Sequence, residues 1–459
     1  MTDTPLLLAG DFATPTAADW EVEVLKVLNR RRPEGTELTV EQAMARLRTT
    51  TADGLRIEPL YTESDIPLGH PGVMPFTRGT MTKTSPATGW DIRQFHEDPD
   101  VAFTKAQILA DLERGATSVW LRLGPDAIAP SDLAAVLDEV DPNLAPISVS
   151  SIEDQVAAAT ALAEYFTATG APHATGNFGL DALAAAARTG APAELGPQAE
   201  WVAKALAQFP GVRALTVDAL PYDDAGAGDV DQLAFAIATG VAYLRDLEAA
   251  GISPEQAFGQ LAFRVSANTD QFTTIARLRA LRRLWARVGE VSGVPANARG
   301  AMQHAVTSWR MITRDDPWVN LLRGTIATFA AAVGGAEIVT TLPFDTAWGL
   351  PDDFSRRMAR NTQLVAAEES NIGRVIARAG GSWYVEQLTD QLATKAWATF
   401  VEIEEAGGMV KALSSGLVAD KIAGVSTERA KRLATRKLPL TGVSMFPLAD
   451  EEPVKAKPR

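Results

Sequence analysis

The loop 219–228 holds the residues whose position most favours chemistry. An apolar run, 214–217, predicts a buried strand before it, and an amphipathic pattern predicts a helix after it, with Asp229 as a good N-cap. A loop that leaves the C-terminal end of a strand lies on the catalytic face of an eight-stranded α/β barrel. The loop contains no His, Lys, Cys, Ser or Arg, so its candidate catalytic residues are the four at 221–224.

Pro221, Tyr222, Asp223 and Asp224 are the side chains that this loop offers. Two carboxylates could act as general acid and base if they converged on one substrate. Neighbours in sequence need not converge, and a run of Asp, Ala and Gly is typical of a solvated turn whose acids cap the next helix. We therefore expect Asp223 and Asp224 to be solvated, non-catalytic residues.

The four histidines do not share the spacing of metal ligands. His70 lies in a Gly-His-Pro-Gly turn, and His96 begins a segment that we expect to be a solvated turn. His173 and His304 fall in predicted strands, where we expect a histidine that is hydrogen-bonded in a polar barrel interior. Neither HExxH nor DxHxxG occurs, so no metal site is predicted.

Charged residues around 264–287 suggest structural roles. Arg264 lies in a predicted strand and Asp270 just after it, and a charge in a barrel strand needs a partner. We expect these two to form an ion pair that fills the barrel axis together with the bulky Phe263. A helix with one solvated basic face is predicted to carry Arg277, Arg279, Arg282, Arg283 and Arg287.

Strand and helix patterns alternate from Val101 onward. Seven strands are predicted, at 118–123, 146–150, 173–178, 213–219, 261–266, 301–306 and 337–342. Helices are predicted between them, at 102–114, 131–139, 153–168, 198–208, 229–249, 271–288 and 318–333. Alternation indicates a parallel sheet, and no strand–helix turn reads GxGxxG as an open dinucleotide-binding sheet would. The predicted fold class is α/β, a TIM-type (β/α)8 barrel.

Helical segments flank the barrel at both ends. Residues 1–55 predict a helical arm that contacts a partner, 56–410 the barrel, and 411–459 a C-terminal helix and linker. The arm presents the apolar residues Trp20, Val24, Val27 and Leu47 and is too small to hold a core of its own. Beyond the barrel, helices are expected at 354–370 and 385–406, and the chain is expected to become less structured after about 407.

Composition excludes several function classes. The 459 residues contain no cysteine, which excludes disulfides and thiolate nucleophiles and fits a cytoplasmic protein. The net charge of −14 gives no electrostatic footprint for nucleic acid. No run of eighteen apolar residues and no secretory leader occur, so neither a membrane partner nor export is expected.

Several segments resemble the methylmalonyl-CoA mutase family, whose members interconvert methylmalonyl-CoA and succinyl-CoA with adenosylcobalamin. They are 71–79, 90–94, 225–245, 275–286, 359–364 and 380–397, in order along most of the chain between about 55 and 410. The resemblance implies a cobalamin-capped α/β barrel with acyl-CoA along its axis. It points to the small, non-catalytic subunit of the heterodimeric bacterial enzymes.

The departures from the family pattern support a non-catalytic chain. Pro221 stands where the family has the histidine that binds the thioester carbonyl, and Phe95 stands where it has an active-site tyrosine. Proline has no side-chain donor, and phenylalanine has no hydroxyl. Other substrate-contacting positions are also replaced, and they hold Met81, Lys83, Thr84, Thr88, Gln260 and Ala262.

The resemblance therefore implies no catalytic, cofactor-binding or metal-binding residue on this chain and no cobalamin-binding domain. Adenosylcobalamin would be bound by a large catalytic subunit in a 1:1 heterodimer. Two alternatives remain open. The chain could be a divergent acyl-CoA mutase or lyase that uses Tyr222, Asp223 and His304, or an accessory protein that gates cofactor loading.

Overall fold

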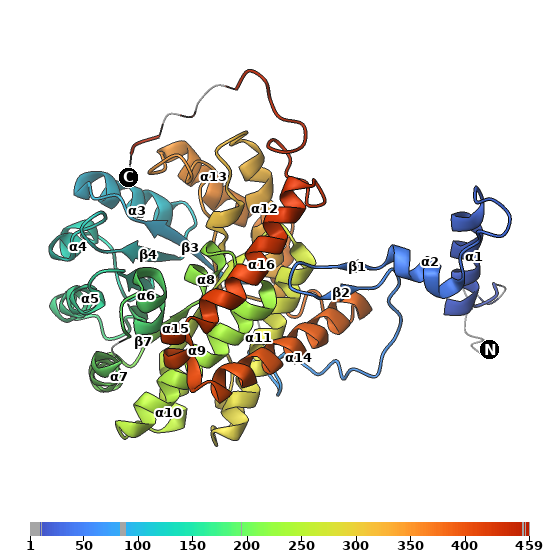
Figure 1. Cartoon of the computed structure of the whole chain (residues 1–459). Coiled ribbons are helices and arrows are strands. Elements are labelled where there is room, and N and C mark those ends of the chain that lie inside the picture. Colours follow the sequence, from blue (N-terminus) through green and yellow to red (C-terminus); the bar gives the residue numbers. More distant parts are fainter. Residues whose placement is uncertain are drawn as a thin grey trace, which may run out of the picture. The chain divides into compact units, whose positions relative to one another are not determined.

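The computed structural model describes residues 10, 12–82, 89–193, 195–451, 454 and 456–458. The chain forms two compact units, Met1–Glu63 and Ser64–Arg459. Figure 1 shows the elements of both units, coloured along the sequence.

Eight parallel strands close the barrel of the second unit. They are β3 (Asp91–His96), β4 (Ser118–Arg122), β5 (Ile147–Ser150), β6 (Gly176–Leu180), β7 (Val212–Asp218), β8 (Leu261–Ala267), β9 (Gln303–Thr307) and β10 (Ile338–Thr340). Consecutive strands pair, and β10 closes the barrel on β3 with Ile338 opposite Asp91. The predicted (β/α)8 barrel is therefore confirmed.

Three sequence-based expectations about the barrel strands are wrong. Strand β3 was not predicted, because its sequence Asp-Ile-Arg-Gln-Phe-His lacks the apolar run of a buried strand. The segment predicted at 173–178 begins as a strand only at Gly176, so His173 is exposed and outside the barrel interior. His96 ends β3 and is 2% exposed, which contradicts the expected solvated turn.

Helices surround the strands (Figure 1). They are α3 (Val101–Glu113), α4 (Leu133–Val136), α5 (Gln155–Thr169), α6 (Ala182–Thr189), α7 (Gly196–Gln208), α8 (Leu220–Asp224), α9 (Asp229–Ala249), α10 (Pro254–Gln260), α11 (Gln271–Val291), α12 (Val319–Gly334), α13 (Asp353–Leu364), α14 (Trp383–Glu405), α15 (Gly408–Ser415) and α16 (Leu417–Ala434). The short α6, α8 and α10 were not predicted. The helix expected within 411–459 is present as α16, but the chain stays helical beyond residue 407, where less structure was expected.

Aspartate N-caps begin several of the helices that follow strands. Asp100, Asp154, Asp181 and Asp270 each accept a hydrogen bond from a backbone N–H in the first turn of the helix that they precede. Such a cap satisfies a donor that the helix leaves unpaired. Asp229 was expected to cap α9, but it is the first helical residue and Gly228 is the N-cap.

Helix α11 is largely buried, and three of its five arginines are not on a solvated face. Arg277, Arg279 and Arg282 are each 1% exposed, whereas Arg283 and Arg287 form ion pairs nearer to solvent. Arg282 donates to the carbonyls of Gly334 and Gly335 at the end of α12 and of Phe76 and Thr77. Arg279 instead pairs with the carboxylate of Glu386 on α14. The predicted basic face was wrong because these acceptors, buried carbonyls and carboxylates from other elements, are not visible in the helical pattern.

The N-terminal unit is small and sparsely packed. It contains α1 (Ala17–Asn29), α2 (Val40–Leu47) and the antiparallel pair β1 (Thr49–Thr50) and β2 (Arg56–Ile57). Capping boxes at Thr16 and Thr39 begin the two helices. Between them lies a small buried cluster of Leu38, Ala43 and Met44, so the unit holds a minimal core where none was expected. No residue of α1 is buried.

Among the described residues, no helix is both long and apolar enough to cross a membrane. Within the same ranges, no three His, Asp or Glu side chains gather as they would around a metal ion.

Candidate functional site

Two cavities lie in the described part of the barrel interior. One, of about 330 Å³, opens at the C-terminal ends of the strands and is lined by Phe95, Trp120, Asp218 and Trp309 among others. The other, of about 570 Å³, lies at the N-terminal ends of the strands. We call them the mouth cavity and the base cavity. The mouth cavity occupies the face where α/β barrel enzymes carry out catalysis.

A layer of side chains separates the two cavities, and we call Arg93, Trp120, Arg264 and His304 the central layer. The guanidinium group of Arg264 lies 4.1 Å from the centre of the Trp120 ring, and its Nη1 is 3.3 Å from Asp218. Stacking on an aromatic face and pairing with a carboxylate are both favourable for a desolvated arginine. Arg93 is held beside it by Asp91 and by the hydroxyls of Ser118 and Ser148.

His304 belongs to the central layer as a neutral side chain. Its Nδ1 accepts a hydrogen bond from Arg264 at 3.4 Å, and its Nε2 is 2.8 Å from the hydroxyl of Thr340. Burial, followed by the positive charges of Arg93 and Arg264, holds the pKa of His304 well below its usual range. The prediction of a hydrogen-bonded histidine in the barrel interior is confirmed.

The predicted filling of the axis is only partly right. Arg264 does lie in the interior, but its carboxylate partner is Asp218 and not Asp270, which is exposed and caps α11. Phe263 does not fill the axis, because its ring packs on Trp285 of α11 with 4.8 Å between ring centres. Successive residues of a strand point to opposite sides, so Arg264 and Phe263 cannot share the interior.

Aromatic rings form one wall of the mouth cavity. The Phe95 ring is 4.3 Å from that of Trp120 and 5.9 Å from that of Trp309, measured between centres. Phe95 extends from β3 and Trp120 from β4, which pair at these two residues. The position where the resemblance places a tyrosine hydroxyl is therefore part of an apolar wall.

Acidic residues line the opposite side of the mouth cavity. Burial raises the pKa of Asp181 to about 7, although Tyr243 and two backbone N–H groups donate to its carboxylate. Burial also raises the pKa of Asp224 to about 6, with Arg188 3.5 Å away opposing the shift. Both acids follow strands, β6 and β7, and that position is the signal by which Asp181 could have been found from sequence.

Most of the loop 219–228 is buried, and of its residues Asp224 and Ala225 are exposed. Pro221 is buried in the first turn of α8, where a proline needs no N–H partner. Asp223 is completely buried and accepts hydrogen bonds from Ser308 at 2.5 Å, and from Gln232 and Arg310 at 3.1 Å each. Burial raises the pKa of Asp223, but the charge of Arg310 and the hydroxyl of Ser308 outweigh it and hold the pKa below the usual range. The expectation of a solvated carboxylate pair was wrong for Asp223.

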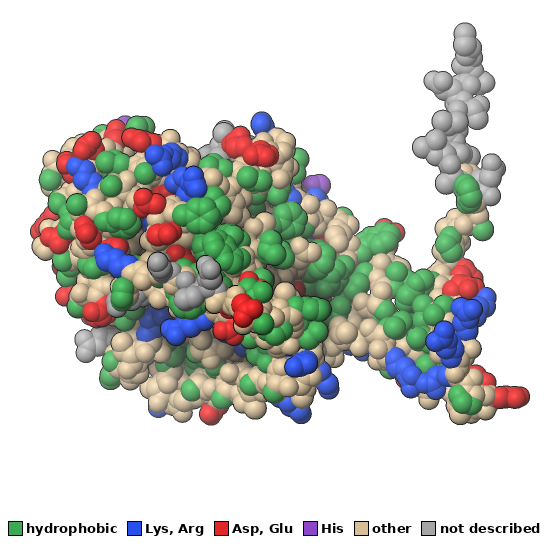
Figure 2. Space-filling view, turned by 90° about the horizontal axis from the view of Figure 1, so that it is seen from above, with side chains coloured by type: hydrophobic (Ala, Val, Ile, Leu, Met, Phe, Trp, Pro, Cys, Tyr) green, Lys and Arg blue, Asp and Glu red, His purple; other side chains and the backbone are tan. Residues whose placement is uncertain are grey.

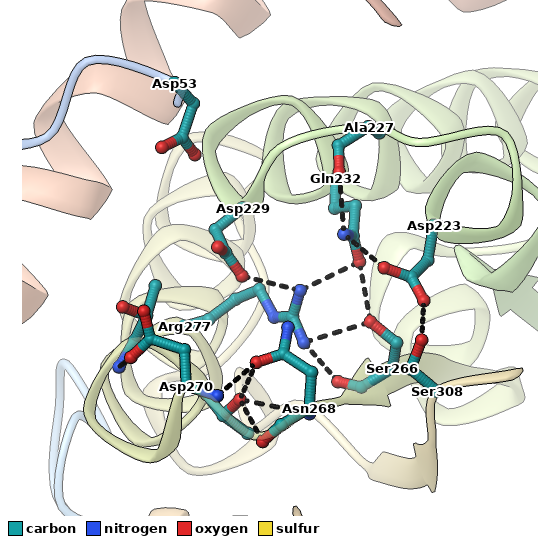
Figure 3. Close-up of polar contacts among 12 residues, drawn as sticks. Asp53, Asp223, Ala227, Asp229, Gln232, Ser266, Asn268, Asp270, Arg277 and Ser308 are labelled. Atoms are coloured by element: carbon teal, nitrogen blue, oxygen red, sulfur yellow. Dashed lines mark hydrogen bonds and ion pairs between the residues drawn. The ribbon is translucent and has the colours of Figure 1, made fainter. Parts of the chain in front are cut away.

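A polar network continues from Asp223 to α11 (Figure 3). The carbonyl oxygen of the Gln232 side chain accepts from Ser266 at 3.0 Å and from Arg277 at 2.9 Å. Arg277 also donates to the backbone carbonyl of Ser266 and pairs with Asp229 at 2.8 Å. From α16, Arg429 donates to the carbonyls of residues 226 and 227. These contacts join the loop to β8, α9, α11 and α16, so it is held from several sides.

The three residues of the alternative enzyme hypothesis do not meet in one site. The Tyr222 ring packs on Phe235, 5.1 Å away between centres, and burial raises its pKa. Asp223 is committed to Ser308 and Arg310, and His304 to the central layer. None of the three lines the mouth cavity. The structure therefore does not bring them together for acid–base chemistry.

The remaining replaced positions have ordinary surroundings or lie outside the described residues. Lys83, Thr84 and Thr88 fall within 83–88, which the structure does not describe. Met81 and Ala262 line the base cavity. The side chain of Gln260, the last residue of α10, accepts a hydrogen bond from the backbone N–H of residue 214, which ties α10 to β7.

The residues present do not fit an acyl-CoA chain that runs along the barrel axis. The central layer occupies the axis between the two cavities, and Arg264 in it is 3% exposed. Phe95 and Pro221 supply no donor for a thioester carbonyl. Of the described side chains that line the mouth cavity, none is a histidine that could act as a cobalt ligand.

Comparison with known proteins agrees with the architecture. The family model described as Methylmalonyl-CoA mutase matches residues 50–163 and 130–458. The methylmalonyl-CoA mutase small subunit of Propionibacterium freudenreichii subsp. shermanii is 52% identical, over 100% of this chain and 73% of its own length. That of Streptomyces virginiae is 48% identical, over 99% of this chain and 74% of its own. The methylmalonyl-CoA mutase of Escherichia coli is 30% identical, over 95% of this chain and 64% of its own. Residues, fold and relatives agree, and the chain belongs to the methylmalonyl-CoA mutase family.

Proposed function

We propose that this chain is the small, non-catalytic subunit of a methylmalonyl-CoA mutase. In this role it supports the isomerisation of methylmalonyl-CoA and succinyl-CoA that a large subunit carries out. The observation that carries the proposal is the central layer, where Arg264, Trp120 and His304 occupy the path that a substrate would need. The names of the relatives support the same role.

The proposal assigns adenosylcobalamin to the large subunit and no catalytic, cofactor-binding or metal-binding residue to this chain. The apolar wall around Phe95 and the buried Pro221 support this assignment, because neither residue can donate to a ligand. Independent catalysis by Tyr222, Asp223 and His304 is not favoured, since each has separate structural partners. A cytoplasmic location, which the cysteine-free composition fits, is part of the same proposal.

The N-terminal unit is proposed to contact the large subunit in a 1:1 heterodimer. The expected division was 1–55 for this contact, 56–410 for the barrel and 411–459 for the C-terminal extension. Because β2 (Arg56–Ile57) pairs with β1, we extend the proposed contact unit to Glu63. The structure of α1 supports the first assignment, because none of its residues is buried and Val22 and Val27 are 47% and 71% exposed. These apolar side chains are open to contact with a partner.

Co-expression with the large subunit of the same organism tests the proposal. We expect a 1:1 complex with mutase activity, whereas this chain alone should be inactive. By calorimetry it should bind neither adenosylcobalamin nor methylmalonyl-CoA at micromolar concentration. A chain without residues 1–63 should lose co-elution while its barrel unfolds as before. Activity of the isolated chain, or stoichiometric binding of either ligand to it, would contradict the proposed role.

A further inference from the structure

Helix α12 presents an apolar stripe on the outer surface of the barrel unit. Trp318, just before the helix, and Leu322, Ile326 and Phe329 recur at intervals of three and four residues, which places them on one helix face. Their exposures are 54%, 65%, 41% and 38%. Phe354 of α13, 41% exposed, extends the stripe, with its ring 6.4 Å from that of Trp318. Figure 2 shows hydrophobic side chains gathered on this side of the barrel unit.

The stripe carries no charge, although 22% of the chain is charged. Arg323 is the single charged residue of α12, and it is 6% exposed. Its guanidinium group donates to Thr313 and Asn320 at 2.7 Å each and to the carbonyl of Thr441 at 2.5 Å. The charge of the helix is thus turned inward, and its outward face is left uncharged, with Thr325 as an exposed polar side chain beside the stripe. An outer helix of a barrel that faced only water would normally carry a polar outer face.

The area of the stripe matches the apolar part of a stable interface. Large aromatic side chains cover about 150–250 Å² each, so five large residues at these exposures present on the order of 400–500 Å². A standard interface takes about 800 Å² from each partner, of which roughly 60% is apolar. Charged side chains adjoin the stripe, since Arg357 lies 5.5 Å from the Phe354 ring and Asp353 precedes that residue. An apolar centre beside a charged edge is the usual anatomy of such an interface.

We propose that the stripe of Trp318, Leu322, Ile326, Phe329 and Phe354 is a second docking surface for the large subunit. The inference rests on the proposed function, since the relatives' printed name, small subunit, implies a larger partner. A second copy of this chain is the weaker occupant, because two chains of net charge −14 repel each other. The stripe belongs to the barrel, so it would supply contact area that does not depend on the N-terminal unit.

The test compares three forms of the full chain co-expressed with the large subunit. Leu322→Glu/Ile326→Glu places two charges in the stripe with a residue that favours helices, so α12 should persist. The matched control, Leu144→Glu/Val291→Glu, changes two apolar residues elsewhere on the barrel that are 81% and 70% exposed. We expect the stripe variant to bind the large subunit at least about 100-fold more weakly, because uncompensated charges are buried. The wild type and the control should co-elute with it.

Further outcomes decide against the inference. If the wild type and both variants bind equally, the stripe is not a docking surface, although the proposed function stands. If the wild type itself does not bind the large subunit, the proposed function fails and the inference with it. A wild-type chain that forms a dimer by itself, and that the stripe variant converts to a monomer, would assign the stripe to a second copy. If the stripe variant does not fold, hydroxyl-radical footprinting of the wild type replaces it. The inference then requires that Trp318 is oxidised less in the complex with the large subunit than in the free chain.

Discussion

The loop after β7 and the N-terminal unit use their side chains in opposite ways. In the loop, Asp223 is fully buried and accepts from three side chains, and backbone carbonyls at 226 and 227 pair with Arg429. In the described part of the N-terminal unit, α1 buries no residue, and the buried cluster beside it has three members. The barrel face that would be catalytic in an enzyme is stabilised from within, whereas the small unit leaves apolar surface uncovered. The difference indicates that the first region supports the fold and the second is suited to association.

The largest expected effect comes from the loop. Asp223→Ala would leave Arg310, Gln232 and Ser308 without their shared acceptor in a buried site. Removal of one partner from a buried ionic network typically costs about 3–5 kcal/mol. We expect a loss of this size in the free energy of unfolding, measured with urea.

The neighbouring residue supplies the control. Asp224 is about one-third exposed, and its ion pair with Arg188 is long, at 3.5 Å. Asp224→Ala should therefore change the free energy of unfolding by less than about 1 kcal/mol. Equal losses in the two variants would contradict the contrast between a buried network and a partly solvated acid.

The second prediction tests whether the N-terminal unit is energetically separate. Met44 is 6% exposed in the small core, and truncation of a buried methionine costs about 2–5 kcal/mol. Met44→Ala should speed amide hydrogen exchange in α1 and α2 by tens- to hundreds-fold. The melting temperature of the barrel should not move. A barrel that melts at a lower temperature in this variant would show that the two units share their stability.

The third prediction uses the pH dependence of the mouth cavity. Burial raises the folded-state pKa of Asp181 to about 7, whereas an unfolded aspartate has a pKa of about 3.9. Between these values the folded state binds the extra proton, so its free energy of unfolding falls as pH rises. The side chain of Asp181→Asn cannot titrate. Between pH 5 and 7 the free energy of unfolding of this variant should therefore fall less steeply than that of the wild type, with a difference in slope of about 1 kcal/mol per pH unit. Urea titrations at pH 5, 6 and 7 measure this, and parallel curves would exclude a raised pKa.

The smallest effect is expected on the solvated edge of α11. Arg283 pairs with Asp390 at 2.6 Å, but both side chains are 37% exposed. Arg283→Ala should cost less than about 1 kcal/mol in the free energy of unfolding, and added salt should reduce the cost further. A loss as large as that in Asp223→Ala would mean that burial does not separate the two classes of arginine contact.

Much of the fold could be predicted because most barrel strands are short apolar runs between amphipathic helices. Strands β4, β5, β7, β8, β9 and β10 lie where the pattern placed them, whereas β3 did not stand out. Its Arg93 and His96 are polar, and they are buried only because partners arrive from β4, β5 and α13. Such partners are distant in sequence, so no local pattern reveals them.

The sequence predicts the site where the chemistry depends on the type of one residue. It does not predict the site where the chemistry depends on which two side chains pair. Pro221 and Phe95 have no side-chain hydrogen-bond donor, which follows from the residue type alone. That no catalytic donor stands at these positions stays a prediction. The partner of Arg264 could not be found in this way. Asp218 and His304 face it across neighbouring strands, and the register of these strands is set only when the barrel closes. The nearby Asp270 was the wrong choice for that reason.

The pairing of β3 with β10 also has a consequence for synthesis of the chain. The first and last strands of the barrel are neighbours, joined by the pairs Asp91–Ile338 and Ile92–Val339. While the ribosome makes the chain from its N-terminus, the open edge of β3 has no partner until β10 has emerged. Contacts between such distant segments form slowly, and an unpaired parallel edge is prone to aggregate. The barrel can therefore close only after nearly 340 residues have been made, and until then the β10-facing edge of β3 stays unpaired.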